Sequence, residues 1–195
     1  MAKTAIEPAD ILPWETYAAQ RREWRTKMTA VKRPRRIAVG PFVTFFFENW
    51  QTMWHQVQEM LHIEKGGAAQ LPDELAAYNP LIPNGRELVA TFMIEIDDPE
   101  RRKRVLSSLG GIEETAFLEV GGRRIKAVAE SDQDRTTAEG KASSVQFVHF
   151  PLDPAAMAAL REKGGRVLLG LDHPHYAHMT VLPEATRAAL AEDLV

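Results

Sequence analysis

Apolar side chains recur at intervals of three and four residues in two long segments of the N-terminal third of the chain. This spacing predicts amphipathic helices over 14–31 and 50–64, because it places the apolar residues on one helical face. Pro13 opens the first segment and Gly66-Gly67 follows the second, and both are typical helix boundaries. Shorter helices are predicted over 73–78, 98–109, 154–162 and 184–192.

Short apolar or alternating runs between these helices predict β-strands. The run 42–48 is apolar on both faces, which is typical of a central strand in a covered sheet. Gly40-Pro41 predicts a turn before it, and Gly121-Gly122 predicts a two-residue hairpin. Further strands are predicted over 36–39, 88–96, 115–120, 123–129, 145–150 and 166–171. We therefore expect a single α+β domain spanning 1–195, with a mostly antiparallel (mixed) sheet and amphipathic helices packed on it.

The composition is that of a globular chain, with 195 residues, 45% hydrophobic and 26% charged. No cysteine is present. This excludes disulfides, thiolate nucleophiles and any cysteine-ligated iron–sulfur cluster held by this chain. No apolar run approaches the length of about 18 residues that spans a membrane, and the first residues lack a secretory signal. We therefore expect a cytoplasmic protein without a membrane span.

The net charge of −3 is unevenly distributed. Residues 21–36 contain eight basic residues and one acidic residue, a net charge of +7, which leaves −10 for the rest of the chain. A basic stripe can recruit nucleic acid or an acidic partner, although a solvated helix face followed by a charged turn has the same pattern. Because the whole chain is acidic, with a pI near 6.1, nucleic-acid binding is the less favoured interpretation.

Three polar residues lie opposite the apolar face of the predicted helix 50–64. His55, Glu59 and His62 follow each other at intervals of four and three residues, so they form one narrow stripe. Imidazoles and a carboxylate are suitable metal ligands. A solvated polar face explains the same pattern, and only a second element covering the stripe would make it a site.

Two predicted strands share a second pattern. Thr44 precedes Glu48 by four residues, and Thr91 precedes Glu95 by four residues, so each threonine shares a sheet face with its glutamate. If the strands are neighbours, Glu48 and Glu95 can approach each other. Two carboxylates in one site would act in acid–base chemistry or bind a cation. The alternative is that each one emerges into solvent at a strand end.

A third candidate is the segment around 172–178, which contains three of the six histidines. His173 and His175 share a face of an extended chain and could form a metal-binding or proton-transfer pair. An incidental histidine-containing surface loop is the favoured interpretation. A fourth, weaker candidate is the polar loop with Arg135, Lys141 and Ser143, whose cations and hydroxyls suit a carboxylate or phosphate.

Several strings resemble those of a bacterial family known only as domain of unknown function 3501. The strings are RRIAVGP (35–41), FEN (47–49), QVQEM (56–60), AYNPLIP (77–83), IEI (94–96), GKASSV (140–145) and DHP (172–174). They occur in matching order over nearly the whole chain, and QVQEM is the most specific. The family has no assigned activity. Its members are often encoded beside rubrerythrin-like di-iron proteins and iron–sulfur oxidoreductases, which implies a role in redox or oxidative-stress metabolism.

The resemblance changes the order of the candidate sites. Gln56, Gln58 and Glu59 match the family string, whereas His55 and His62 do not. It therefore favours a polar Gln56/Glu59 face that meets Asn79 or a ligand over a histidine-rich metal site. His173 also matches the family string, which keeps it, with Glu59, as a candidate metal ligand.

Three functions follow as hypotheses. The leading one is an accessory protein of a bacterial redox system that binds a partner protein or a small ligand, with self-association as an additional hypothesis. The second is a small-molecule enzyme, metal-dependent or not, with Glu48, Glu59 and Glu95 as catalytic residues, His173 and Glu59 as metal ligands, and Gln56, Asn79, Arg135, Lys141 and Ser143 as ligand-binding residues. The third is a nucleic-acid binder that uses 21–36. The residues do not identify a cofactor.

Overall fold

The computed structural model describes residues 3–130, 136–137 and 140–195. Its α-helices are α1 (Trp14–Lys32), α2 (Trp50–Glu64), α3 (Gly67–Tyr78), α4 (Pro99–Leu106), α5 (Pro154–Arg161) and α6 (Glu184–Ala191). Short 3₁₀ helices are η1 (Pro8–Asp10), η2 (Arg33–Arg35), η3 (Asn79–Leu81) and η4 (Ile112–Thr115). The strands are β1 (Arg36–Val39), β2 (Val43–Phe47), β3 (Glu87–Ile94), β4 (Ala116–Val120), β5 (Arg123–Lys126), β6 (Val128–Ala129), β7 (Val145–Pro151), β8 (Val167–His173) and β9 (Tyr176–Val181).

The strands form two antiparallel sheets. Sheet A has the order β1-β2-β3-β7-β6, and sheet B has the order β5-β4-β8-β9. Their inner faces share one large hydrophobic cluster, which includes Phe45 and Phe92 of sheet A and Leu118 and Leu169 of sheet B. The α+β class and the antiparallel pairing predicted from the sequence are confirmed, with the strands divided between two sheets.

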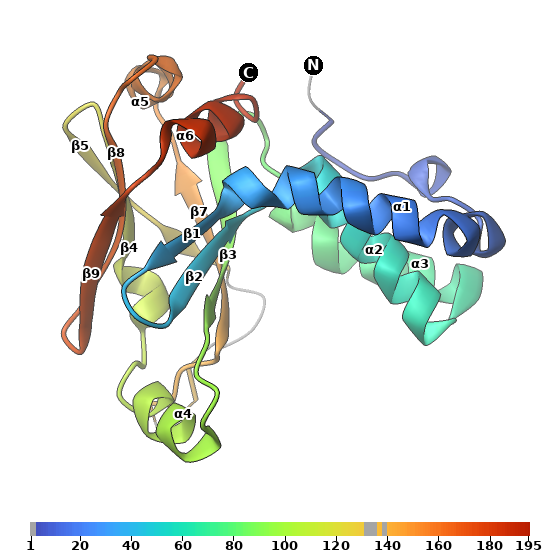
Figure 1. Cartoon of the computed structure of the whole chain (residues 1–195), viewed down its shortest axis with the longest axis horizontal. Helices are drawn as coiled ribbons and strands as arrows, with labels where there is room; N and C mark the ends of the chain where they lie inside the picture. Colours follow the sequence, from blue (N-terminus) through green and yellow to red (C-terminus); the bar gives the residue numbers. More distant parts are fainter. Residues whose placement is uncertain (1–2, 131–135, 138–139) are drawn as a thin grey trace.

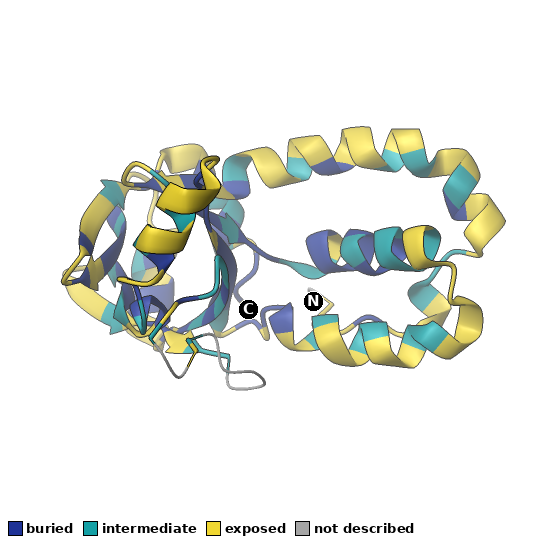
Figure 2. Ribbon diagram, turned by 90° about the horizontal axis from the view of Figure 1, so that it is seen from below, coloured by how far each residue is buried: buried dark blue, intermediate teal, exposed yellow. Residues whose placement is uncertain are grey.

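Helices α1, α2 and α3 form a layer that extends to one side of the sheets (Figure 1). α2 lies between the other two and is the most buried of the three, as its dark colour in Figure 2 shows. A second hydrophobic cluster, which includes Tyr17, Trp54, Val57 and Val89, holds this layer together and joins it to the outer face of sheet A. The long amphipathic helices predicted over 14–31 and 50–64 are both present.

Two strands differ from the sequence prediction. The predicted strand 123–129 divides at the buried Ala127, so that β5 belongs to sheet B and β6 to sheet A. The segment after His173 forms β9, although a surface loop was the favoured interpretation. β9 is an edge strand that buries Tyr176 and leaves most of its other side chains exposed or half-buried, so its sequence lacks the alternation that reveals a strand.

Helix α3 also differs, because it begins at Gly67 rather than near residue 73 and contains Pro72 in its interior. A proline removes one helical hydrogen bond, and here the acceptor that loses its partner is the carbonyl of the exposed Ala68. Water can satisfy that carbonyl, which explains why the helix continues through Pro72.

Among the described residues, no helix is long and apolar enough to cross a membrane.

Candidate functional site

The junction between β2 and α2 positions Glu48. The Asn49 side chain accepts a hydrogen bond from the Thr52 backbone N–H at 2.9 Å, and the Thr52 hydroxyl accepts one from the Asn49 N–H at 2.9 Å. This reciprocal cap starts α2 directly after the strand. The Glu48 backbone N–H donates to the Val89 carbonyl at 2.8 Å, which extends the pairing with β3 by one residue. The local sequence therefore fixes the Glu48 side chain between the sheet and the helix.

Two threonine hydroxyls hold the Glu48 carboxyl group. Thr52 on α2 donates to Oε2 at 2.6 Å, and Thr91 on β3 donates to Oε1 at 2.8 Å. Glu48 is only 8% exposed. Burial raises its pKa, and these two hydrogen bonds together with the positive charges of Lys32 and Arg35 offset the effect only in part. Glu48 therefore retains its proton to a higher pH than a glutamate in water.

A cavity of about 300 Å³ opens next to this carboxyl group, between the outer face of sheet A and α2. Gln56 lines it from α2, and its amide N–H lies 3.4 Å from the Tyr78 hydroxyl oxygen. Aromatic and sulfur-containing side chains form most of the remaining wall: Phe46, Phe47, Met53, Met93 and Phe147. The arrangement combines one buried acid, two hydroxyls and an amide with an apolar surface, which is the usual construction of a small-molecule site.

Arg35 borders the cavity, and an ion pair offsets its positive charge. Its guanidinium group forms a bidentate ion pair with Asp193, at 2.7 Å and 2.9 Å, and both side chains are buried. It also donates to the Ala189 carbonyl at 2.8 Å. Lys32, exposed at the edge of the cavity, has no ion pair within the part of the chain that the structure describes. A ligand in the cavity would therefore meet one available positive charge.

Glu95 does not reach this cavity. β2 and β3 are neighbours, which was the condition for Glu48 and Glu95 to approach each other. The two strands run antiparallel, however, so Glu95 lies opposite Phe42 and Glu48 lies opposite Val89. Six residues of strand, about 20 Å, separate the two ends. Each glutamate accepts from the threonine of the other strand: Thr44 donates to Glu95 at 2.6 Å, and Thr91 donates to Glu48. Glu95 is exposed, with Arg36 at 3.8 Å.

Glu59 lies in the interface between α1 and α2. Tyr17 donates to it at 2.6 Å, and Arg21 donates from two nitrogens at 2.9 Å and 2.8 Å. The hydrogen bonds from Arg21, with the one from Tyr17, lower the pKa of Glu59 to about 2 despite its partial burial. α1 therefore covers the polar stripe of α2. His55 is only 8% exposed, and burial lowers its pKa, so the solvated-face interpretation of this stripe is wrong.

The other predicted residues lie outside the Glu48 cavity. Asn79 accepts a hydrogen bond from the Ile6 N–H at 2.7 Å and donates to the Ile6 carbonyl at 3.1 Å, so it fastens the N-terminal segment. In the loop before β7, Lys141 is exposed and the Ser143 hydroxyl accepts from the Val145 N–H at 3.2 Å. Arg135 lies outside the described residues.

His173 is buried at the end of β8. Its Nδ1 accepts from the His175 N–H at 3.2 Å, and its Nε2 lies 3.2 Å from the Gly110 carbonyl, which makes Nε2 the donor of a neutral ring. Both nitrogens thus have partners, one in the turn between β8 and β9 and one in the segment between α4 and η4, and His173 lies far along the chain from Glu59 in the helical layer. Within the described ranges, no three His, Asp or Glu side chains are arranged to hold a metal ion.

Within the residues that the structure describes, four of the eight basic residues of 21–36 have acidic partners. The pairs are Arg21–Glu59, Lys27–Glu23, Arg35–Asp193 and Arg36–Glu95. Glu23 is already counted in the net charge of +7, so Glu59, Asp193 and Glu95 are the partners that offset part of it.

Sequence reasoning missed Thr52 and Thr91 as partners of Glu48. It also missed His149, which lies on β7 next to the edge strand β6 of sheet A. His149 on β7 lies between Glu87, at 3.1 Å from Nδ1, and Glu130, at 2.6 Å from Nε2. The period-two pattern places Glu87, Val89 and Thr91 on one face and was a usable signal for Thr91. No spacing in the sequence relates Glu130 to Glu87.

The fold and the cavity define an α+β protein in which a layer of helices packs on the outer face of one of two paired sheets and borders a small, partly polar cavity. The chain belongs to the family described as Protein of unknown function (DUF3501), whose model matches residues 5–194. This confirms the resemblance noted in the sequence.

A solved structure similar to this chain is described as a "novel protein of unknown function" from Burkholderia pseudomallei K96243. The two are 35% identical, with a TM-score of 0.91, and the match covers 98% of this chain and all of the other. No curated protein matches the chain.

Proposed function

We propose that this protein binds a small organic molecule in the cavity beside Glu48. The observation that supports the proposal is a carboxyl group buried in the wall of a partly open cavity and oriented by hydroxyls from two different elements, Thr52 and Thr91. A carboxyl group is costly to bury unless its polar atoms are paired. Holding one in the wall of a cavity that combines polar and apolar side chains favours a role toward a ligand over a role in packing.

The lining limits the ligand to a small, mixed polar and apolar molecule. The cavity volume is that of about ten water molecules in the liquid. A protonated Glu48 and the Gln56 amide can each donate and accept, so they suit hydroxyl, carbonyl or amide groups. The rings of Phe46 and Phe147 suit a flat apolar part. Lys32 at the edge favours a neutral or singly anionic molecule.

The resemblance supplies the expected setting of this binding function. An accessory component of a redox system that has no cysteine would act by holding a small molecule or a partner protein. The Glu48 cavity supports the small-molecule form of that hypothesis. Self-association and a protein partner remain further proposals for the same setting.

Saturation-transfer NMR with a set of small hydroxy, keto and amide metabolites tests the binding function. We expect at least one compound to bind the wild type and to bind Glu48→Leu about tenfold more weakly, since that variant removes the polar group but retains the bulk. Glu95→Leu is the matched control, because it changes the equivalent glutamate outside the cavity and should retain binding. Binding that survives Glu48→Leu, or a wild type that binds no compound, would contradict the proposal.

A proton-transfer enzyme is the second candidate, and the raised pKa of Glu48 favours it. Glu48 would act as the acid–base group, while Gln56 would position the substrate. Glu48→Gln distinguishes the two functions, because glutamine preserves the shape and one oxygen that accepts from a threonine hydroxyl, but cannot exchange a proton. A binding protein should retain its ligand in this variant, whereas an enzyme should bind its substrate and lose turnover by at least about 100-fold.

A further inference from the structure

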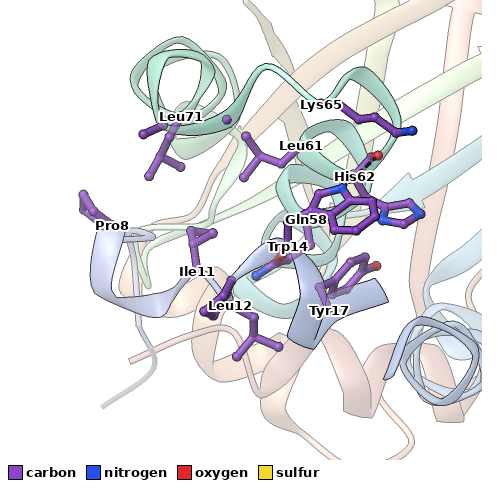
Figure 3. A pocket seen from close by; sticks show the side chains of 13 residues that line it. Pro8, Ile11, Leu12, Trp14, Tyr17, Gln58, Leu61, His62, Lys65 and Leu71 are labelled. Atoms are coloured by element: carbon purple, nitrogen blue, oxygen red, sulfur yellow. Dashed lines mark hydrogen bonds between the residues drawn. The ribbon is translucent and has the colours of Figure 1, made fainter. Parts of the chain in front are cut away.

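A second cavity, of about 580 Å³, lies on the other side of α2. The N-terminal segment, α1, α2 and α3 border this partly open cavity, and Figure 3 shows its wall of mainly apolar side chains, among them Ile11, Leu12, Trp14, Leu61 and Leu71. It shares no lining residue with the Glu48 cavity. Its volume falls within the usual range for sites that bind small organic molecules.

Gln58 is the most deeply buried polar side chain of this wall apart from the Tyr17 hydroxyl, which is paired with Glu59. It is 2% exposed, and its Nε2 has no hydrogen-bond partner. In Figure 3 its side chain lies between Trp14 and Leu12. A buried amide group without a partner is destabilising, and native proteins have few of them. A ligand oxygen in the cavity would supply the missing acceptor.

Among its lining residues, this cavity has no acidic side chain, and the Lys65 ammonium group lies 5.9 Å from the centre of the Trp14 ring. Glu59, which bonds to the lining residue Tyr17, is already paired with Arg21. His62 also lines the cavity, is stacked against Trp14 and has a buried Nδ1 without a partner. His62 also borders an open hollow with Arg21, Arg22 and Arg25. The entrance therefore favours an anionic group over a cationic one.

The string QVQEM contributes one lining residue to each of the two cavities. Residues two apart on a helix point to opposite sides, so Gln56 lines the Glu48 cavity and Gln58 lines the second one. Glu59, next in the string, fastens α1, which forms one wall of the second cavity. Each polar residue of the string thus has a separate place in this arrangement.

We propose that the second cavity binds an amphiphilic carboxylate, whose apolar body fills the space between α1, α2 and α3, whose carboxylate oxygen accepts from Gln58, and whose negative charge faces Lys65. This site goes beyond the small-molecule function of the Glu48 cavity and does not depend on it.

Calorimetric titration with decanoate and with 1-decanol tests the proposal. We expect decanoate to bind with a dissociation constant below about 1 mM and about fivefold more tightly than 1-decanol, the ratio that one exposed ion pair typically supplies. Lys65→Met should remove that preference. Lys103→Met, which changes an exposed lysine on the distant α4, should retain it.

Substitutions at two neighbouring alanines of α3 test whether decanoate binds in this cavity. Ala68 lines the cavity and Ala69 does not, and both are exposed on the same helix. Ala68→Phe should reduce decanoate affinity at least about tenfold by occupying the cavity, whereas Ala69→Phe should retain it. Equal binding by these two variants, equal affinity for decanol and decanoate, or no binding at 1 mM would each overturn the proposal. Glu48→Leu should bind decanoate normally, which separates this result from the function of the first cavity.

Discussion

Glu48 and Glu95 show how strongly position determines the chemistry of one residue type. Each lies at an end of the same strand pair, and each accepts a hydrogen bond from a threonine across that pair. α2 covers the end with Glu48, and its side chain is buried, whereas Glu95 remains exposed beside Arg36. The difference between a candidate acid–base group and a surface charge therefore comes from the element that covers the sheet.

The raised pKa of Glu48 predicts how stability depends on pH. The folded protein holds this proton to a higher pH than the unfolded chain, whose glutamate pKa is 4.5. The contribution of Glu48 to stability is therefore complete below about pH 4.5 and is lost as the pH rises through the folded-state pKa. Glu48→Gln does not titrate, so its stability relative to the wild type should increase between pH 4 and pH 8. Urea unfolding across this range measures the difference, and parallel curves for the two proteins would contradict it.

At the residue scale, the sequence singled out Glu48 and Gln56 as separate candidate residues, and the structure places both in the wall of one cavity. The expected approach of Glu48 to Glu95 is wrong, because the two lie at opposite ends of the strand pair. Period-two alternation shows which side chains share a face, and it carries no information on which ends of two strands meet. The pattern places Thr91 on the same face as Val89, but it does not identify Thr91 or Thr52 as a partner of Glu48. Their role depends on α2 turning back over the sheet, which is a tertiary contact.

At the scale of elements, the contact between α1 and α2 depends on polar groups as well as on the apolar cluster around Tyr17. Tyr17 and Arg21 together saturate Glu59. The helical spacing predicted the stripe of α2 but not the helix that covers it, because α1 is itself charged along most of its surface. Local periodicity therefore identified both helices and left their contact unassigned.

Glu59→Gln should destabilise the protein by about 1–3 kcal/mol at pH 7, since it weakens charge-assisted hydrogen bonds from Arg21. The pKa of Glu59 is lowered to about 2, so its contribution is present above about pH 4.5 and is lost as the pH falls toward 2. The difference between variant and wild type should therefore shrink near pH 2. Glu23→Gln, in the exposed pair with Lys27, is the control and should change stability by less than about 1 kcal/mol.

The edge of sheet A carries a second pH-dependent contact. Burial opposes protonation of His149, but hydrogen bonds to Glu87 and Glu130 and their charges outweigh it and raise the pKa of His149. The stabilisation is complete below about pH 6.5 and is lost as the pH rises through the folded-state pKa. NMR titration of the imidazole should give a pKa above 6.5. In Glu130→Gln it should be lower, and an unchanged value would contradict the role of Glu130.

At the scale of the whole molecule, a buried ion pair joins the segment after the first long helix, α1, to the segment after the last helix, α6. Arg35 follows α1, and Asp193 follows α6. Burial raises the pKa of Asp193, and Arg35 acts in the opposite direction. The sequence offered no indication of this contact, because 158 positions separate the partners and the basic stripe and family string that contain Arg35 do not point to Asp193.

Arg35→Met should destabilise the protein by about 3–5 kcal/mol, because it leaves Asp193 buried without its partner. Asp193→Leu in addition should recover much of that loss, since the double variant no longer buries an unpaired charge. Urea unfolding of the two single variants and the double variant gives the coupling. Additive losses in the double variant would show that the two groups act independently.

At Ala127 the chain passes from β5 in sheet B to β6 in sheet A, and this connection affects how the two sheets can separate. Ala127 donates to the Ala116 carbonyl at 2.9 Å on one side, while Val128 pairs with His149 on the other. Across the molecule, the Tyr176 hydroxyl of β9 donates to the Val39 carbonyl of β1 at 2.7 Å. The next residue is Gly40, where a Cβ would lie only 2.5 Å from the Tyr176 hydroxyl oxygen. Neither sheet can separate without breaking both connections. The slowest-exchanging amide protons of β3 and β8 should therefore report one common opening free energy, so that the two sheets protect their backbones as a single cooperative unit.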